Sequence, residues 1–173
     1  ALLLFRLAWG LFGSRWARFS SWRPTPARIR AYLGGNPHPD DRVGHSPLGT
    51  LAVIALLLVL ALQVGTGLVS DDEIAFVGPL NHLVSSATGL AATDWHKHLG
   101  KLLVLLLVVV HVGAVLYYLF ARRQNLIAPM VHGDKSLDAP APASRDDLPM
   151  RLWALALALV ACGGVYWLVR PAG

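Results

Sequence analysis

Three histidines lie in or beside one long apolar run, Leu99 to Phe120. They are the residues of this sequence with the greatest capacity for chemistry. His111 lies well inside the run and is flanked by valines. An imidazole without a partner at that depth would cost several kcal/mol of desolvation, so we expect it to have one. A neutral imidazole can give one ring nitrogen to a metal while the other donates a hydrogen bond. We interpret His111 as an axial ligand of haem iron, with a hydrogen bond to a neighbouring helix as the alternative.

His96 and His98 lie near the start of the same run, and their spacing from His111 distinguishes between them. On an ideal helix, the step from His96 to His111 rises about 22 Å and ends about 60° past a whole number of turns. The step from His98 ends about 140° away. The geometry therefore favours His96 as the ligand of a second haem on the same helix, with His98 as the alternative ligand. Either residue can instead be a simple interfacial histidine.

Four further histidines lie outside the apolar runs. His38 and His132 fall in polar connections, and His45 and His82 lie just beyond the ends of apolar segments. Solvated side chains are the default at such positions, so we expect none of the four to bind a metal.

The histidines must be positioned by apolar helices, and the composition provides for these. Hydrophobic residues make up 55 % of the 173 residues and charged residues 14 %, which is not the balance of a soluble surface. Leu48 to Val69 and Leu152 to Val169 contain no charged residue, and Leu99 to Phe120 contains only Lys101. Each run is close to the roughly 20 residues that cross a hydrocarbon core of about 30 Å. The sequence predicts an all-α transmembrane helical bundle.

Within this bundle we predict a half helix at 1–12 and complete spans at 48–69, at 96–120 and within 150–173. The half helix at the start of the chain is interpreted as the second part of a helix whose beginning is missing. Residues 131–149, which are rich in proline and aspartate, are expected to form a linker.

The charges of the connections predict the orientation. The net charge is +5, and the basic residues gather in connections 13–47 and 121–151, whereas 70–95 carries four carboxylates and neither lysine nor arginine. Basic connections stay in the cytoplasm, so 13–47 and 121–151 are predicted to be cytoplasmic, and 70–95 and the C-terminus periplasmic. This is the pattern of a multi-pass protein of the bacterial cytoplasmic (inner) membrane. It makes lipid, and not nucleic acid, the expected surroundings of the basic residues.

Several short segments are specific only in combination. They are Phe5-Arg-Leu-Ala-Trp-Gly10, Gly13-Ser-Arg-Trp-Ala-Arg-Phe19, Gly44-His-Ser-Pro-Leu-Gly49, Gly78-Pro-Leu80, Trp95-His96, His111-Val-Gly-Ala-Val115 and Asn125-Leu-Ile-Ala-Pro-Met130. With these segments, which run along nearly the whole chain, the sequence resembles the bacterial membrane cytochromes b of the b-561 and nickel-iron-hydrogenase type.

The resemblance implies a four-helix haem-binding core, to which 1–130 would contribute, and a fifth helix of some members at 150–173. It also implies two b haems, each held by two histidines, with the fourth helix supplying His96 to one haem and His111 to the other. The family spacing is usually 14 residues and here it is 15, which implies either a local bulge or His98 as the ligand. The partner ligands would lie upstream of Ala1, so the chain is expected to be a fragment. Arg6 is a candidate partner for a haem propionate or a lipid phosphate, with a simple solvated position as the alternative.

The function implied is electron transfer between the quinone or quinol pool and a redox partner of the respiratory chain. The partner would be periplasmic or membrane-bound, such as a c-type cytochrome or a dehydrogenase subunit. The chain would then be an electron-transfer protein or the cytochrome subunit of an oxidoreductase. A non-redox anchor or scaffold subunit of a respiratory complex is the alternative, and a pigment-binding antenna subunit is a third.

Overall fold

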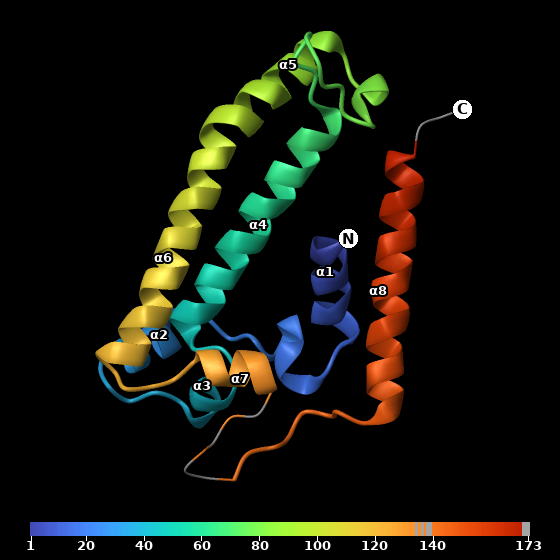
Figure 1. Cartoon of the computed structure of the whole chain (residues 1–173). Helices are drawn as coiled ribbons and strands as arrows, with labels where there is room; N and C mark the ends of the chain where they lie inside the picture. The colour runs from blue at the N-terminus through green and yellow to red at the C-terminus, as the bar shows by residue number, and fades with distance from the viewer. Residues whose placement is uncertain (134, 136, 138–139, 171–173) are drawn as a thin grey trace.

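The computed structural model describes residues 1–133, 135, 137 and 140–170. Within them the regular elements are helical, apart from one isolated antiparallel bridge between Asp71 and Val77 (Figure 1). The α-helices are α1 (Leu2–Phe12), α2 (Pro26–Leu33), α3 (Pro39–Val43), α4 (Pro47–Val69), α5 (Ser86–Trp95), α6 (Lys101–Phe120), α7 (Ile127–His132) and α8 (Leu148–Val169). A π-helical segment, His96–Gly100, joins α5 to α6, and short 3-10 turns lie at Arg15–Ala17, Phe19–Ser21 and Asn81–Leu83. The prediction of an all-α fold is confirmed.

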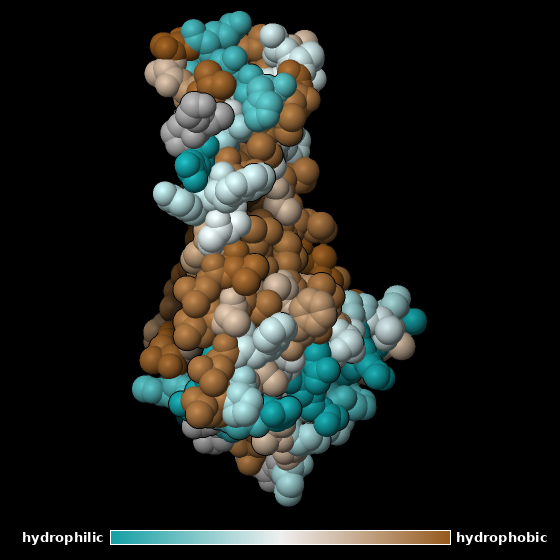
Figure 2. Space-filling model, turned by 90° about the vertical axis from the view of Figure 1, so that its right-hand side faces the viewer, coloured by the Kyte–Doolittle hydropathy of each residue, from teal (hydrophilic) through white to brown (hydrophobic). Residues whose placement is uncertain are grey.

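The described residues contain three helices long and apolar enough to cross a membrane. They are Pro47–Val69, the continuous helix Ser86–Phe120 and Leu148–Val169. Figure 2 shows the result on one face of the molecule, where a hydrophobic band separates two more polar ends. Large apolar side chains stay exposed along these helices because lipid, and not protein, solvates them. The chain is a multi-pass membrane protein.

Local sequence signals fix where two of the spanning helices begin. The Ser46 hydroxyl accepts a hydrogen bond from the Gly49 N–H at 3.1 Å, and Pro47 opens α4. The Asp147 carboxylate accepts one from the Met150 N–H at 3.0 Å at the start of α8. Both are N-caps that satisfy backbone donors left free at a helix start. They set α4 and α8 at the positions where the apolar runs begin.

The helix that carries His96 and His111 begins earlier than predicted. Residues 86–95 were expected to belong to a connection, but they form α5, which continues through the π-helical segment into α6. Ser85 caps this start, its hydroxyl accepting from the Thr88 N–H at 3.3 Å. Small residues on one side of α5, Gly89, Ala92 and Thr93, are buried and α5 packs on α4. This packing stabilises a helix that the mixed composition of residues 86–95 does not reveal.

The helices form two neighbouring pairs, as Figure 1 shows. α4 runs antiparallel beside α5 and α6, and α1 packs against α8 with fewer contacts to α4. We call the end that holds α2, α3 and α7 the basic end, and the end that holds the loop 70–85 the acidic end. Residues 134, 136 and 138–139 of the predicted linker and 171–173 of the predicted C-terminal segment lie outside the described residues.

The loop 70–85 is tied to the helices on both sides of it. The Asp71 N–H donates to the Thr93 hydroxyl at 2.9 Å, and this hydroxyl donates to the Asp71 carbonyl at 2.7 Å. The Asn81 amide donates to the Val69 carbonyl at 2.8 Å, and the Leu80 N–H to the Leu68 carbonyl at 2.8 Å. The acidic end is thus closed by hydrogen bonds within one helical hairpin, Pro47–Phe120.

Candidate functional site

His96 and His111 lie on the same stripe of the helix Ser86–Phe120. The less exposed positions of this helix follow one another at helical spacing, while the residues between them are mostly exposed. The stripe consists of Ala92, His96, Gly100, Val104, Leu107, His111 and Val115. Its helix packs against α4. The structure therefore brings the two predicted ligand residues onto one face of one helix.

The π-helical segment accounts for the unusual spacing of the two histidines. A π-turn accommodates one residue more than an α-turn, so the 15-residue interval acts as about 14 residues of regular helix. Fourteen residues at 100° end about 40° short of four turns, which keeps both side chains on one face. The local bulge expected from the family spacing is present, and it begins at His96 itself.

Gln63 of α4 holds the π-helical segment. Its side-chain amide donates to the His96 carbonyl at 3.0 Å, a backbone oxygen of the irregular turn. In return the His96 Nδ1 lies 2.9 Å from the Gln63 carbonyl and 3.4 Å from the Thr66 hydroxyl. A carbonyl can only accept, so the contact with Gln63 requires the proton of His96 to be on Nδ1. That tautomer leaves Nε2 with a free lone pair for a metal.

Two glycines make room for this arrangement. At Gly67 of α4 a Cβ would lie 2.9 Å from the His96 Cε1 and 3.2 Å from its Nδ1. At Gly100 a Cβ would collide with the Gln63 Oε1. The imidazole and the amide therefore occupy positions that any larger residue at 67 or 100 would fill.

A groove beside His96 opens between the acidic end of α4, the loop 70–85 and the end of α8. Its volume is ≈ 1170 Å³, and its wall is largely apolar. Gly67, Leu68, Phe76, Val77 and Trp167 contribute to this lining. His82, which we predicted not to bind a metal, also lines the groove.

His98 lies on another side of the helix from His96. Its side chain is 73 % exposed, and its Nδ1 lies 2.9 Å from a carboxylate oxygen of Asp94. His111 is half-buried on the α4-facing stripe, and a Cβ at nearby Gly113 would meet no atom within 4 Å. His38 has a structural role, since its Nδ1 accepts from the Asp40 N–H at the start of α3.

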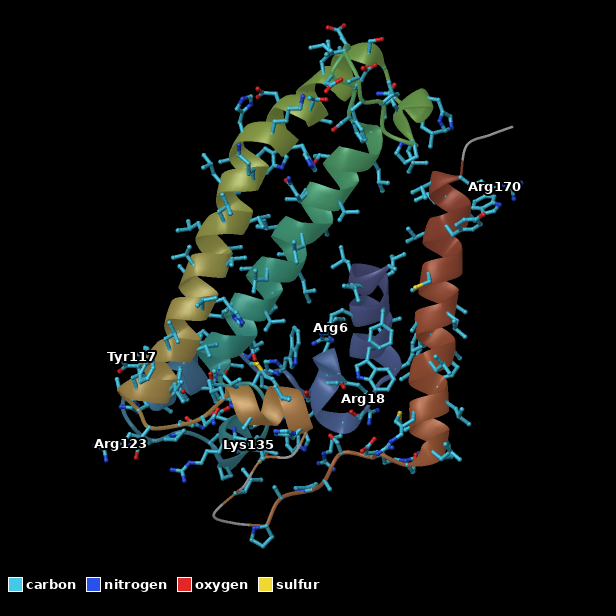
Figure 3. The ribbon with its side chains drawn as sticks, in the orientation of Figure 1. Arg6, Arg18, Tyr117, Arg123, Lys135 and Arg170 are labelled. Atoms are coloured by element: carbon cyan, nitrogen blue, oxygen red, sulfur yellow. The ribbon has the colours of Figure 1, made fainter. Side chains whose placement is uncertain are left out.

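Arg6 lies toward the basic end (Figure 3), where its guanidinium is over the rings of Phe19 and Trp22. Its guanidinium carbon is 5.4 Å from the centre of the Phe19 ring and 5.5 Å from that of Trp22. The His45 ring lies 5.6 Å from that of Trp22. Partial burial, together with the positive charges of Arg6 and Lys135, lowers the pKa of His45. Arg6 thus places a positive charge at the basic end, far along the fold from the groove at the acidic end.

The family model of prokaryotic cytochrome b561 matches residues 1–133. The chain belongs to the prokaryotic cytochrome b561 family. It is therefore a membrane b-type cytochrome of a family that binds haem b and takes part in electron transfer. The match ends before α8. No curated protein and no solved structure matches the sequence.

The donor set of this cytochrome fits haem better than a bare metal ion. Among the described residues, no three His, Cys, Asp or Glu side chains gather as a bare ion would require. A haem iron takes four nitrogens from its own macrocycle and needs only axial ligands from protein. A single imidazole with a carbonyl behind its Nδ1, as at His96, is an arrangement common among histidines that ligate a metal.

Sequence reasoning missed Gln63, Thr66 and Gly67 of the cytochrome. Gln63 is the only amide in the apolar run from Leu48 to Val69. A polar side chain inside a spanning helix is costly, and this cost is the signal that could have singled it out. Its partner could not have been named, because the pairing depends on how α4 meets the π-helical segment.

Proposed function

We propose that this cytochrome carries electrons across the membrane through two b haems, one ligated by His96 and the other by His111. The observation that carries the proposal is their common stripe, with a rise of about 22 Å between them along one helix. That separation allows one haem near each side of a hydrocarbon core of about 30 Å. The resemblance to the family implies a second axial histidine for each haem.

The haem supplies the one-electron redox chemistry when it is bound. The residues of the chain would set its environment. Gln63 and Thr66 orient His96 and fix its tautomer, and the carbonyl behind Nδ1 makes the imidazole a stronger donor. The largely apolar lining of the groove would reduce the contact of water with the ligand side. Arg6 would balance a propionate of the haem at the basic end.

The proposal extends to the orientation of the chain and to its redox partners. Connections 13–47 and 121–151 would face the cytoplasm, and 70–95 and the C-terminus the periplasm of a bacterium. Quinone or quinol would exchange electrons within the membrane, and a c-type cytochrome or dehydrogenase subunit would do so at the acidic end. There Asp72 accepts from the N–H groups of Ala75 and Phe76 and from Lys97, which holds the pKa of its carboxyl well below the usual range. Asp72 thus stays ionised and pairs with Lys97, while the carboxylates of Asp71 and Glu73 give the loop its negative charge toward a basic partner.

The proposed domain organisation follows the family. Residues 1–130 would form part of the haem-binding core, 131–149 a linker, and 150–173 an additional transmembrane helix. The match to the family over residues 1–133 supports this division.

The experiment is a reduced-minus-oxidised optical spectrum of the full-length protein in detergent, with His96→Ala, His111→Ala and His98→Ala. We expect a b-type α-band in the wild type, a partial loss with each of the first two variants and no loss with His98→Ala. A loss caused by His98→Ala in place of His96→Ala would move the ligand to His98. No band in the wild type would leave a non-redox anchor subunit as the function.

A further inference from the structure

A second hollow lies at the basic end, away from both proposed ligands. Its volume is ≈ 720 Å³, and it opens between the end of α6, α7 and the segment around α3. Four basic side chains line it: Arg42, Arg122, Arg123 and Lys135. Figure 3 shows Arg123 and Lys135 at the same end of the molecule. The hollow therefore concentrates positive charge in one place.

The negative charge in this hollow is already neutralised. Asp41 is the one carboxylate among its described lining residues, and it forms a buried ion pair with Arg28. Its second oxygen accepts from the His38 N–H at 3.0 Å. None of the four basic side chains forms an ion pair with a carboxylate of the described residues. Counted over the described residues alone, the hollow has an excess of about four positive charges for a ligand to balance.

The backbone after α6 brings two of these charges to the hollow. Arg123 has a φ of 51°, a left-handed conformation that is unfavourable for a residue with a side chain. The turn is held by hydrogen bonds from the Arg122 N–H to the Tyr117 carbonyl and from the Gln124 N–H to the Tyr118 carbonyl. Strained residues of this kind are often found where a ligand is bound.

The hollow also offers a hydroxyl donor. The Tyr32 and Tyr118 hydroxyl oxygens lie 2.5 Å apart. The pair holds two protons and uses one between its oxygens, so the other is free to donate to a ligand oxygen. Lys135, elsewhere in the lining of the hollow, is half-buried, and its partial desolvation lowers its pKa. An anion next to its ammonium would offset that cost.

The position of the hollow, next to the end of a membrane-spanning helix, favours a lipid as the source of the anion. Arg122 and Arg123 come directly after the last turn of the spanning helix, and Arg42 lies five residues before α4 begins. In the last turn of α6, the side chains of Tyr117 and Phe120 are exposed by 55 % and 74 % and form an apolar surface toward the membrane. A phosphate at this level would continue into acyl chains along that surface.

We propose that this hollow binds the phosphate group of an anionic phospholipid from the adjoining leaflet. Guanidinium and ammonium groups bind phosphate oxygens through charge-assisted hydrogen bonds, and a tyrosine hydroxyl adds a neutral one. The proposal does not depend on the haem ligands or on the orientation of the chain in the membrane.

The test measures lipid selectivity with the full-length protein in vesicles of phosphatidylcholine that contain a minor fraction of spin-labelled phosphatidylglycerol. The variant is Arg122→Gln combined with Arg123→Gln. The control is Arg145→Gln combined with Arg151→Gln, the same loss of charge at the same end, where both arginines pair with Asp147 and Asp146. We expect the preference for phosphatidylglycerol to fall about fivefold for each charge removed in the variant and much less in the control. Circular dichroism verifies that both proteins are folded.

Two outcomes would overturn the proposal. An equal loss of selectivity in variant and control would mean that the lipid responds to net charge and not to this hollow. Complete competition by inorganic phosphate, at concentrations that leave the control unaffected, would assign the hollow to free phosphate instead of lipid. Lys135→Gln is an additional variant for the same measurement of lipid selectivity. It removes one charge from the hollow and leaves the turn after α6 unchanged.

Discussion

Gln63 and His96 hydrogen-bond to each other in both directions. The side-chain amide of Gln63 donates to the His96 carbonyl at 3.0 Å, and the Nδ1 of His96 lies 2.9 Å from the Gln63 carbonyl. The first contact supports the backbone of the π-helical segment, and the second orients the imidazole. One residue of α4 thereby controls both the position and the tautomer of the proposed ligand.

Gln63→Leu should destabilise the protein and weaken the site at His96. The substitution leaves the His96 carbonyl without its donor next to an apolar side chain, at a cost of about 1–3 kcal/mol. Thermal unfolding in detergent should occur at a lower temperature, and the midpoint potential of the haem at His96 should shift. Leu62→Met, on the exposed face of α4, is the control and should change neither quantity. An unchanged potential in Gln63→Leu would contradict the positioning role.

Gly67→Ala should displace the His96 ring, whereas Gly65→Ala should not. The new methyl at position 67 would lie 2.9 Å from the His96 Cε1, so the ring must move away from the Gln63 carbonyl. At position 65 a Cβ meets no atom within 4 Å, and alanine is the better helix former by about 1 kcal/mol. We expect the optical α-band to change only in Gly67→Ala. Identical spectra for the two variants would show that the ring does not need the space at Gly67.

Gly100→Ala and Gln63→Leu should not have additive effects. A Cβ at position 100 would collide with the Gln63 Oε1 and push the amide from its place, which has the same consequence as removing it. The double variant should therefore lose little more stability than the more damaging single variant. A double-mutant cycle from denaturation curves measures this coupling. Additive losses would mean that Gly100 matters only for the path of the backbone.

The charge of His45 should depend on Arg6. The folded protein holds the pKa of His45 below its usual value of 6.5 through desolvation and through the charges of Arg6 and Lys135. The unfolded chain therefore binds this proton at a higher pH than the folded protein, so stability should fall as the pH drops below about 6.5. In Arg6→Gln the pKa should rise and this loss should become smaller. Nuclear magnetic resonance titration of the His45 ring reports the pKa, and no change in the variant would exclude the influence of Arg6.

The spans could be predicted from sequence because hydropathy is a property of the residues themselves. The beginnings of α4 and α8 were also encoded locally, in Ser46 with Pro47 and in Asp147. The start at Ser86 was missed, because residues 86–95 mix small, polar and acidic side chains. Their helix is stabilised by Gly89, Ala92 and Thr93 packing on α4, which is a tertiary effect.

The candidate site could be predicted in part. The positions of His96 and His111 followed from helical spacing, and the extra residue between them pointed to a bulge or to His98. The sequence could not place the bulge, because it depends on an amide from another helix, Gln63. The approach of His82 to the same groove likewise depends on the fold of the loop 70–85. Interactions between distant segments were therefore what the sequence did not reveal.

The closed loop at the acidic end also has a consequence for assembly. The hydrogen bonds of Asp71, Leu80 and Asn81 go to α4 and α5, so the hairpin Pro47–Phe120 completes this end without α1 or α8. Closing a short connection costs less chain entropy than closing a long one. The hairpin can therefore form as a unit while the ribosome is still synthesising α8. Helix α8 then packs onto the part of the protein that is already folded, chiefly against α1. The last helix to be placed is also the first that we expect to separate on heating.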